Sequence, residues 1–165
     1  MRLKESVESL WENLTEGWRH LARSAAGALT RFKAGEKTDL PAKSEVDDVN
    51  WLPSLGWGML GGDVYEDDKR LVVRLEVPGM EKEDMQVEVV GDALVVSGEK
   101  RFQREGSEGR WRVMQCAYGS FRRVVPLPAP VRIDEARASY KNGVLRIELP
   151  KVTPSRPEST VIRVD

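Results

Sequence analysis

The sequence predicts an all-β fold, an antiparallel β-sandwich, with a helical arm before it and an extended tail after it. Three observations lead to this prediction. Apolar and polar residues alternate in short runs over the second half of the chain, as they do in half-buried strands. The dipeptide Asn142-Gly143 separates two such runs, and Asn-Gly is typical of a tight hairpin turn because both residues tolerate positive φ. Short strands separated by glycine and proline favour a sandwich over a parallel sheet.

Residues 1–33 are predicted to form the helical arm, because apolar residues recur there at steps of three and four. Acidic side chains come early in the arm and basic side chains come late, which suits the helix dipole. Gly17 and Gly27 weaken the pattern, so two or three shorter helices fit it as well as one. The apolar stripe consists of Leu3, Val7, Leu10, Trp11, Leu14, Trp18, Leu21, Ala25, Ala28 and Phe32.

Three uses fit this apolar stripe. It can pack on its own domain or on other subunits, which is the commonest fate of such stripes. It can lie in a membrane interface, although the four glutamates between residues 5 and 16 weaken that case. It can also stay partly exposed and bind apolar clients.

Residues 34–62 have the composition of a linker, since glycine and proline interrupt any periodicity and charged residues keep the stretch hydrated. Within the linker, residues 51–60 form an apolar patch that follows neither a helical nor a strand period. We therefore expect this patch, which includes Trp51 and Trp57, to dock on another surface rather than to fold alone.

From residue 63 the chain changes to short alternating runs, with turns at Pro78-Gly79 and Gly91-Asp92. A charged loop, residues 99–112, separates the earlier strands from the later ones, and Pro150 ends the last strand. The predicted strands are residues 71–77, 85–89, 93–97, 113–125, 136–141 and 144–149.

The end of the chain reads as a tail, because Pro154 and Pro157 prevent continuation of the sheet and favour an extended conformation. Residues 160–164 then form a single β segment with no hairpin partner. The predicted parts are an arm with linker (1–60), a sandwich domain (61–151) and a C-terminal extension (152–165).

The composition argues against several classes of function. With 26 basic and 27 acidic side chains the net charge is −1, and glutamates are interleaved with the arginines between residues 101 and 123, so no nucleic-acid partner is expected. His20 is the only histidine and Cys116 the only cysteine, so we expect no zinc site and no Cys–His catalytic pair. No nucleotide-binding glycine loop is present. We therefore expect a protein that is not an enzyme and has no cofactor.

Two further features predict a cytoplasmic location. No apolar run approaches the roughly 20 residues that span a bilayer, and the first residues lack the apolar core of a secretory signal. The single cysteine forbids an intrachain disulfide.

The second part of the chain resembles the small heat-shock proteins of the α-crystallin family, bacterial type, over about residues 61–165. Five stretches carry this resemblance, in the same order as in that family. The stretches are residues 63–67 (DVYED), 77–85 (VPGMEKEDM), 94–101 (LVVSGEKR), 118–123 (YGSFRR) ahead of Leu127-Pro128, and 136–151, which contains the Asn-Gly hairpin.

The resemblance implies an immunoglobulin-like sandwich and an ATP-independent chaperone, a holdase that binds unfolding proteins and prevents their aggregation under stress. The implied partners are unfolded or partly folded client proteins and other copies of this chain, as a homodimer and a higher homo-oligomer. The alternative is a non-enzymatic co-chaperone like the CS-domain adaptors, which binds one specific folded partner. The tail motif and the long charged loop favour the holdase, because a monomeric adaptor needs neither.

The resemblance also implies two contacts between subunits. Ile162 and Val164 match the family's I-x-I/V tail motif, and we expect them to dock between strands 85–90 and 136–141, against Val87 and Val89. Trp111, Arg112 and Val113 lie where bacterial and plant members have the strand that dimer partners exchange. The alternative for this loop, residues 100–114, is a Trp111 that packs locally within its own chain.

One departure concerns Gln115-Cys116, which stand where bacterial members often carry Glu-Arg, so an ion pair there is in doubt. We expect Cys116 to be buried or half-buried in a strand. Client binding and part of the assembly are assigned to the arm and the apolar patch. The assigned residues are Leu10, Trp11, Leu14, Trp18, Leu21, Trp51 and Trp57.

Overall fold

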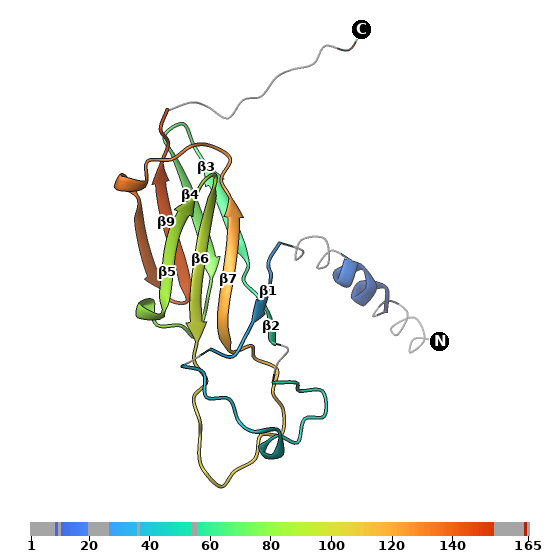
Figure 1. The fold of residues 1–165 in the computed structure, drawn as a ribbon. Helices are drawn as coiled ribbons and strands as arrows, with labels where there is room; N and C mark the ends of the chain where they lie inside the picture. The colour runs from blue at the N-terminus through green and yellow to red at the C-terminus, as the bar shows by residue number, and fades with distance from the viewer. Residues whose placement is uncertain are drawn as a thin grey trace.

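Two antiparallel sheets face each other as a sandwich, with a separate two-stranded ribbon beside them (Figure 1). The structure, a computed structural model, describes residues 9, 11–19, 27–35, 37–53, 56–153 and 164. The strand order is β3-β4-β9-β8 in one sheet and β5-β6-β7 in the other, while β1 and β2 form the ribbon. The strands are β1 (Leu29–Phe32), β2 (Gly56–Met59), β3 (Gly62–Glu66), β4 (Arg70–Glu76), β5 (Met85–Val90), β6 (Ala93–Lys100), β7 (Gly119–Pro126), β8 (Arg137–Lys141) and β9 (Val144–Pro150).

Short helical segments complete the described part of the chain. Residues 11–19 form a helix, and three 3-10 helices connect other elements. The 3-10 helices are η1 (Lys43–Glu45), η2 (Lys82–Asp84) and η3 (Ile133–Glu135).

The core of the sandwich is apolar because every second residue of its strands faces inward. On β4 and β9 the buried residues pair across the two strands, as Leu71 does with Leu149 and Val73 with Ile147. Leu94 of β6 is fully buried from the facing sheet. Burial of one such side chain stabilises the fold by about 1.5–3 kcal/mol. The alternating pattern therefore explains the sandwich that the sequence predicted.

The predicted hairpin at Asn142-Gly143 is confirmed. Both residues have positive φ, 52° and 76°, as a type I′ turn requires. Lys141 pairs with Val144, so the loop of the hairpin has only these two residues.

The helix predicted over residues 1–33 is wrong for its last part, because residues 29–32 form β1. Thr30 and Phe32 are buried while Leu29 and Arg31 are exposed, which is the alternation of a strand. Phe32 packs on Phe121 of β7, with ring centroids 5.3 Å apart. This tertiary contact overrides the helical spacing of the local sequence.

Residues 56–59 also form a strand, where the sequence predicted an irregular patch. Their strand, β2, pairs with β1, and Gly56 lies opposite Phe32. A Cβ atom at Gly58 would lie 3.0 Å from the Phe32 ring, so glycine makes room for this aromatic side chain. The patch therefore docks on another part of the chain, as expected, but it does so as a strand.

The long strand predicted over residues 113–125 is wrong at its start, because β7 begins at Gly119. Gly119 has a φ of 122°, a conformation that side chains with a Cβ rarely adopt, and it interrupts the extended chain. Met114 lies before this break and is buried in a second apolar cluster, away from the sandwich core. The end of the strand at Pro126 agrees with the prediction.

Gly119 also holds the ribbon against the sandwich, and we expect Gly119→Ala to destabilise the fold by about 2–3 kcal/mol. The backbone of Lys33 exchanges hydrogen bonds of 2.9 and 2.6 Å with Ser120. A Cβ atom at residue 119 would lie only 2.1 Å from the Lys33 carbonyl oxygen, so the two strands must separate. The measurement is the free energy of unfolding in urea. Gly106→Ala, in open space, is the matched control, and equal stability of the two variants would contradict the prediction.

Candidate functional site

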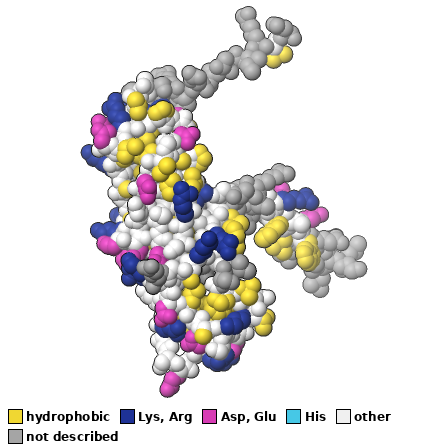
Figure 2. All heavy atoms as spheres, in the orientation of Figure 1, with side chains coloured by type: hydrophobic (Ala, Val, Ile, Leu, Met, Phe, Trp, Pro, Cys, Tyr) yellow, Lys and Arg dark blue, Asp and Glu magenta, His cyan; other side chains and the backbone are white. Residues whose placement is uncertain are grey.

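The helix at residues 11–19 presents an exposed apolar face, which has no apolar partner among the described residues. Trp11, Leu14 and Trp18 are between 63% and 71% exposed, and their spacing of three and four places them on one side of the helix. Figure 2 shows hydrophobic side chains on the surface of this segment. Leu10 and Leu21, which the sequence assigned to the same face, lie outside the described residues.

The two tryptophans of the apolar patch have different environments. Trp57 of β2 is exposed, on the same outer face of the ribbon as Leu29 and Met59. Trp51 is buried, so it does not belong to the exposed apolar surface to which the sequence assigned it. The sequence could not show this burial, because Phe102 and Met114, which share a cluster with Trp51, lie about fifty to sixty residues further along the chain.

The partners of Trp51 form a second apolar cluster below the sandwich, where two loops meet. Val46 and Trp51 come from the linker, while Phe102 and Met114 come from the charged loop that follows β6. Trp111 packs edge-on against Phe102, with ring centroids 5.1 Å apart. Figure 1 shows both loops side by side at the lower end of the molecule. Within one chain, Trp111 is therefore packed locally, as the alternative interpretation of this loop expects.

Ion pairs surround this second cluster and join the same two loops. Asp47 of the linker accepts hydrogen bonds from Arg110 and Arg112. Arg104 donates to Asp39 over 3.2 Å and to Glu45 over 3.0 Å. The charged residues of the linker and of the charged loop were both visible in the sequence. Their positions in the sequence did not show that the two segments are in contact.

Three carboxyl groups of the linker, those of Glu45, Asp47 and Asp48, are held in their charged form. The Arg110 guanidinium that donates to Asp47 lowers the pKa of that carboxyl. The backbone N–H of Ala42, and then Arg104, lower the pKa of Glu45. The pKa of Asp48 is lowered chiefly by the backbone N–H of Met114. All three shifts arise from contacts that exist only when the linker is folded, and those of Asp47 and Asp48 depend on the charged loop.

Acid is therefore expected to release the linker from the charged loop. A lowered pKa stabilises the folded state above the ordinary value, which is 3.8 for Asp47 and 4.5 for Glu45, and this stabilisation is lost as the pH falls through the lowered value. The amides of Asp47 and Trp111 bond across the two loops, so their hydrogen exchange should accelerate below about pH 4 relative to intrinsic rates. Unchanged protection at pH 3, with Leu71 of the core as the internal reference, would contradict the prediction.

Free sheet edges form another part of the site. β5 ends one sheet and β8 ends the other, so among the described residues each has one edge without a neighbouring strand. Figure 1 shows β5 and the orange-brown β8 on the same side of the sandwich. Val87 and Val89 of β5 are half-buried and pack against the core. Such an edge can accept an added strand.

The tail that the sequence assigns to these edges lies mostly outside the described part of the chain. Ile162 is not among the described residues, and Val164 is 96% exposed. The docking of this tail therefore stays a prediction.

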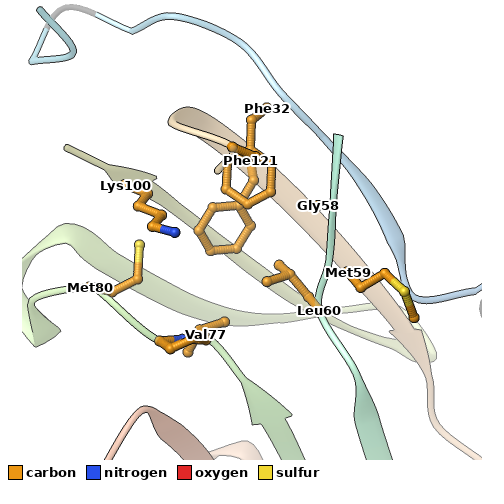
Figure 3. Close-up of a pocket in the computed structure, with 10 residues that line it drawn as sticks. Phe32, Gly58, Met59, Leu60, Val77, Met80, Lys100 and Phe121 are labelled. Carbon is orange, nitrogen blue, oxygen red and sulfur yellow. The ribbon is translucent and has the colours of Figure 1, made fainter. Parts of the chain in front are cut away.

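An apolar hollow of about 150 Å³ lies between the ribbon and the sandwich (Figure 3). The rings of Phe32 and Phe121 lie together on one side, and the Lys100 side chain points toward them. Leu60 and Val77 also line the hollow. It suits an apolar side chain, and its lining offers no carboxylate, with the Lys100 amine as its one charged group.

The described residues contain no group of three or more side chains that could hold a metal ion.

Cys116 is exposed in an irregular segment, whereas the sequence predicted a buried or half-buried strand residue. Burial, with a smaller effect from Cys116, raises the pKa of Tyr118. No helix in the described part of the chain is long and apolar enough to cross a membrane.

Comparison with known proteins relates this fold to named families. The model of the Hsp20/alpha crystallin family matches residues 63–165. The 17.8 kDa class I heat shock protein of Arabidopsis thaliana is 34% identical over 104 residues, which is 62% of this chain and 66% of that protein. Heat shock protein 16 of Schizosaccharomyces pombe is 37% identical over 101 residues, 60% of this chain and 71% of that protein. The chain spans about two thirds of the length of these relatives.

Solved structures give the same relationship. Heat shock protein 16.0 from Schizosaccharomyces pombe superposes with a TM-score of 0.56 at 34% identity, over 64% of this chain and 97% of that one. The hspA protein of Xanthomonas axonopodis gives a TM-score of 0.51 at 28% identity, over 58% of this chain and 95% of that one. Plant, yeast and bacterial proteins are thus all similar to it, so the relationship is not restricted to the bacterial type. The matched region includes both sheets of the sandwich and more than half of the chain, and this protein therefore belongs to the Hsp20/alpha crystallin family.

Proposed function

We propose that this chain is an ATP-independent holdase, which binds unfolding proteins and prevents their aggregation under stress. Membership of the family supports a chaperone role. The observation that carries the finer proposal is the apolar face of Trp11, Leu14 and Trp18, which has no partner among the described residues. An exposed apolar surface of this kind marks a binding site, and unfolding proteins expose the matching chemistry.

The proposed assembly begins with a homodimer in which residues 111–113 of one copy add to β3 of another. β3 ends its sheet, so it has a free edge among the described residues. Val113 is exposed, as expected of a residue that a second copy would cover in the dimer. Docking of Ile162 and Val164 at β5 of a neighbour would then join dimers into the higher homo-oligomer.

The proposed activity is binding alone, without an enzymatic step or a cofactor. Apolar faces and sheet edges can hold an extended or unfolded chain, but they supply no group that reacts with it. The division at residues 1–60, 61–151 and 152–165 and the cytoplasmic location stay predictions of the sequence.

The test is suppression of aggregation. A heat-labile model enzyme is warmed with increasing amounts of the chain, without nucleotide, and light scattering is followed; an inert globular protein at equal mass is the control. We expect near-complete suppression at about one chain per client. Absence of suppression, together with capture of one folded partner, would instead support the adaptor alternative.

A further inference from the structure

The strand proposed for exchange is already paired on one of its two edges. The backbone N–H of Trp111 donates to the carbonyl of Glu45 over 3.0 Å, and the N–H of Asp47 donates to the carbonyl of Trp111 over 2.8 Å. These bonds place the linker beside Trp111 as a short parallel bridge with Val46. The linker thus acts as a neighbouring strand within the same chain.

The backbone bonds between this segment and the linker are confined to one residue. Trp111 forms the bridge, and Arg112, which follows it, lies in a bend. Arg110 and Arg112 flank Trp111 on either side. Among the described residues, neither forms a backbone–backbone hydrogen bond.

Side chains fix the strand in this position at both ends. Asp47 pairs with Arg110 and Arg112, one on each side of Trp111. The Asp48 carboxylate accepts the N–H of Met114 over 3.1 Å, just beyond the strand. Arginine–carboxylate hydrogen bonds are directional as well as charged, so they hold the orientation of the strand and not only its position.

From this geometry we infer that linker residues 45–48 form a clamp, which holds residues 110–113 in place while the backbone groups of Arg110 and Arg112 stay available to pair with β3 of a second copy. The inference rests on the proposed function, because it requires exchange of this strand. In the dimer the clamp, the exchanged strand and β3 of the second copy form one continuous sheet.

The clamp matters because the loop on its own has a composition that resists ordering. Gly106 and Gly109 lie in open space, and the loop tip at residues 105–108 is exposed. Fixing such a segment during association costs conformational entropy, and a segment that is already fixed costs less. Asp47 and Asp48 are thus positioning residues for dimerisation, although neither uses the edge that the second copy would occupy.

The first experiment removes the charge of the clamp in the full chain. Asp47→Asn keeps the shape of the side chain, and Asp134→Asn makes the same change at an exposed site without an ion pair among the described residues. The concentration at which half of the chains are monomeric is measured by native mass spectrometry across a dilution series. We expect Asp47→Asn to raise it about tenfold and Asp134→Asn to leave it unchanged. Asp47→Glu, which keeps the charge, should restore most of the loss.

Hydrogen exchange separates positioning from a general loss of stability. In Asp47→Asn the amide of Trp111 should exchange faster, while the core amides of Val73 and Ile147 keep their protection. Loss of protection at all three sites would show a structural role and overturn the inference.

A second pair of variants tests the exchange itself. Arg112→Pro removes the backbone N–H that would pair with the edge of β3, and Arg112→Ala keeps it; both lose the ion pair with Asp47. We expect the dimer to weaken about tenfold in Arg112→Ala and at least about a hundredfold in Arg112→Pro. Equal dimers in the two variants would overturn exchange along this edge, and with it the proposed assembly. If Arg112→Pro disrupts the dimer but Asp47→Asn matches Asp134→Asn, exchange stands and the clamp is overturned.

Discussion

Replacement of Trp11, Leu14 and Trp18 by alanine is expected to remove most of the chaperone activity while the sandwich stays folded. Each side chain offers an apolar surface that an unfolding protein can cover, and full burial of one such side chain is worth about 1.5–3 kcal/mol. Loss of all three should weaken client binding about a hundredfold, because energies at one surface do not add fully. Alanine is the strongest helix former, so the helix itself is retained.

The stability of the sandwich should not change in this triple variant. All three side chains are exposed and none belongs to either apolar cluster, so we expect the thermal midpoint to stay within about 3 °C. The measurement is the amount of chain that halves the light scattering of a heated client. It is paired with hydrogen exchange across β4 and β9.

A matched control removes three apolar side chains that are exposed elsewhere. Val49, Ile133 and Val152 are exposed on the linker, on η3 and just after β9, away from the helix. Their triple alanine variant should keep full activity. Equal loss in both triple variants would show that total apolar area, and not this face of the helix, determines client binding.

The sandwich could be predicted from the sequence because its strands are defined by local patterns. β9 alternates strictly, β4 carries a run of apolar residues, and the turn between β8 and β9 uses Asn-Gly, a dipeptide that favours a two-residue hairpin. These signals need no knowledge of distant residues, since each strand and its turn are adjacent in the sequence.

The ribbon and the second cluster could not be predicted, because their partners are distant in the sequence. Residues 29–32 form a strand only because Phe32 meets Gly56 and Gly58, more than twenty residues away. Asp47 likewise meets arginines more than sixty residues later. The pattern of charges showed that the linker and the charged loop are hydrated. It could not show that the two segments form ion pairs with each other.

The Ile162→Ala and Val164→Ala double variant is expected to reduce the assembly from higher oligomers to dimers. Residues two apart in an extended segment point the same way, so both side chains can bind one surface while Arg163 faces water. From Lys151, just after β9, to Ile162 is eleven residues, which reach up to roughly 36 Å. That length is sufficient for the tail to cross to another subunit.

The free edge of β5 is the proposed receptor for this tail, with Val87 and Val89 as its apolar lining. Burial of two aliphatic side chains supplies on the order of 3–5 kcal/mol before the costs of association. Each contact is weak alone, but many copies acting together can hold an assembly that heat loosens. Pro154 and Pro157 restrict the free tail, so less entropy is lost when it docks.

Sedimentation velocity of the full chain measures this effect, and the tail itself provides the control. Val161→Ala with Arg163→Ala changes the opposite face of the same segment and should leave the oligomers intact. A synthetic peptide of residues 158–165 should compete with the tail and release dimers, whereas the same peptide with alanine at 162 and 164 should not. If the double variant keeps its large oligomers, the tail does not join the dimers. If the two peptides act alike, β5 does not recognise Ile162 and Val164 as a pair.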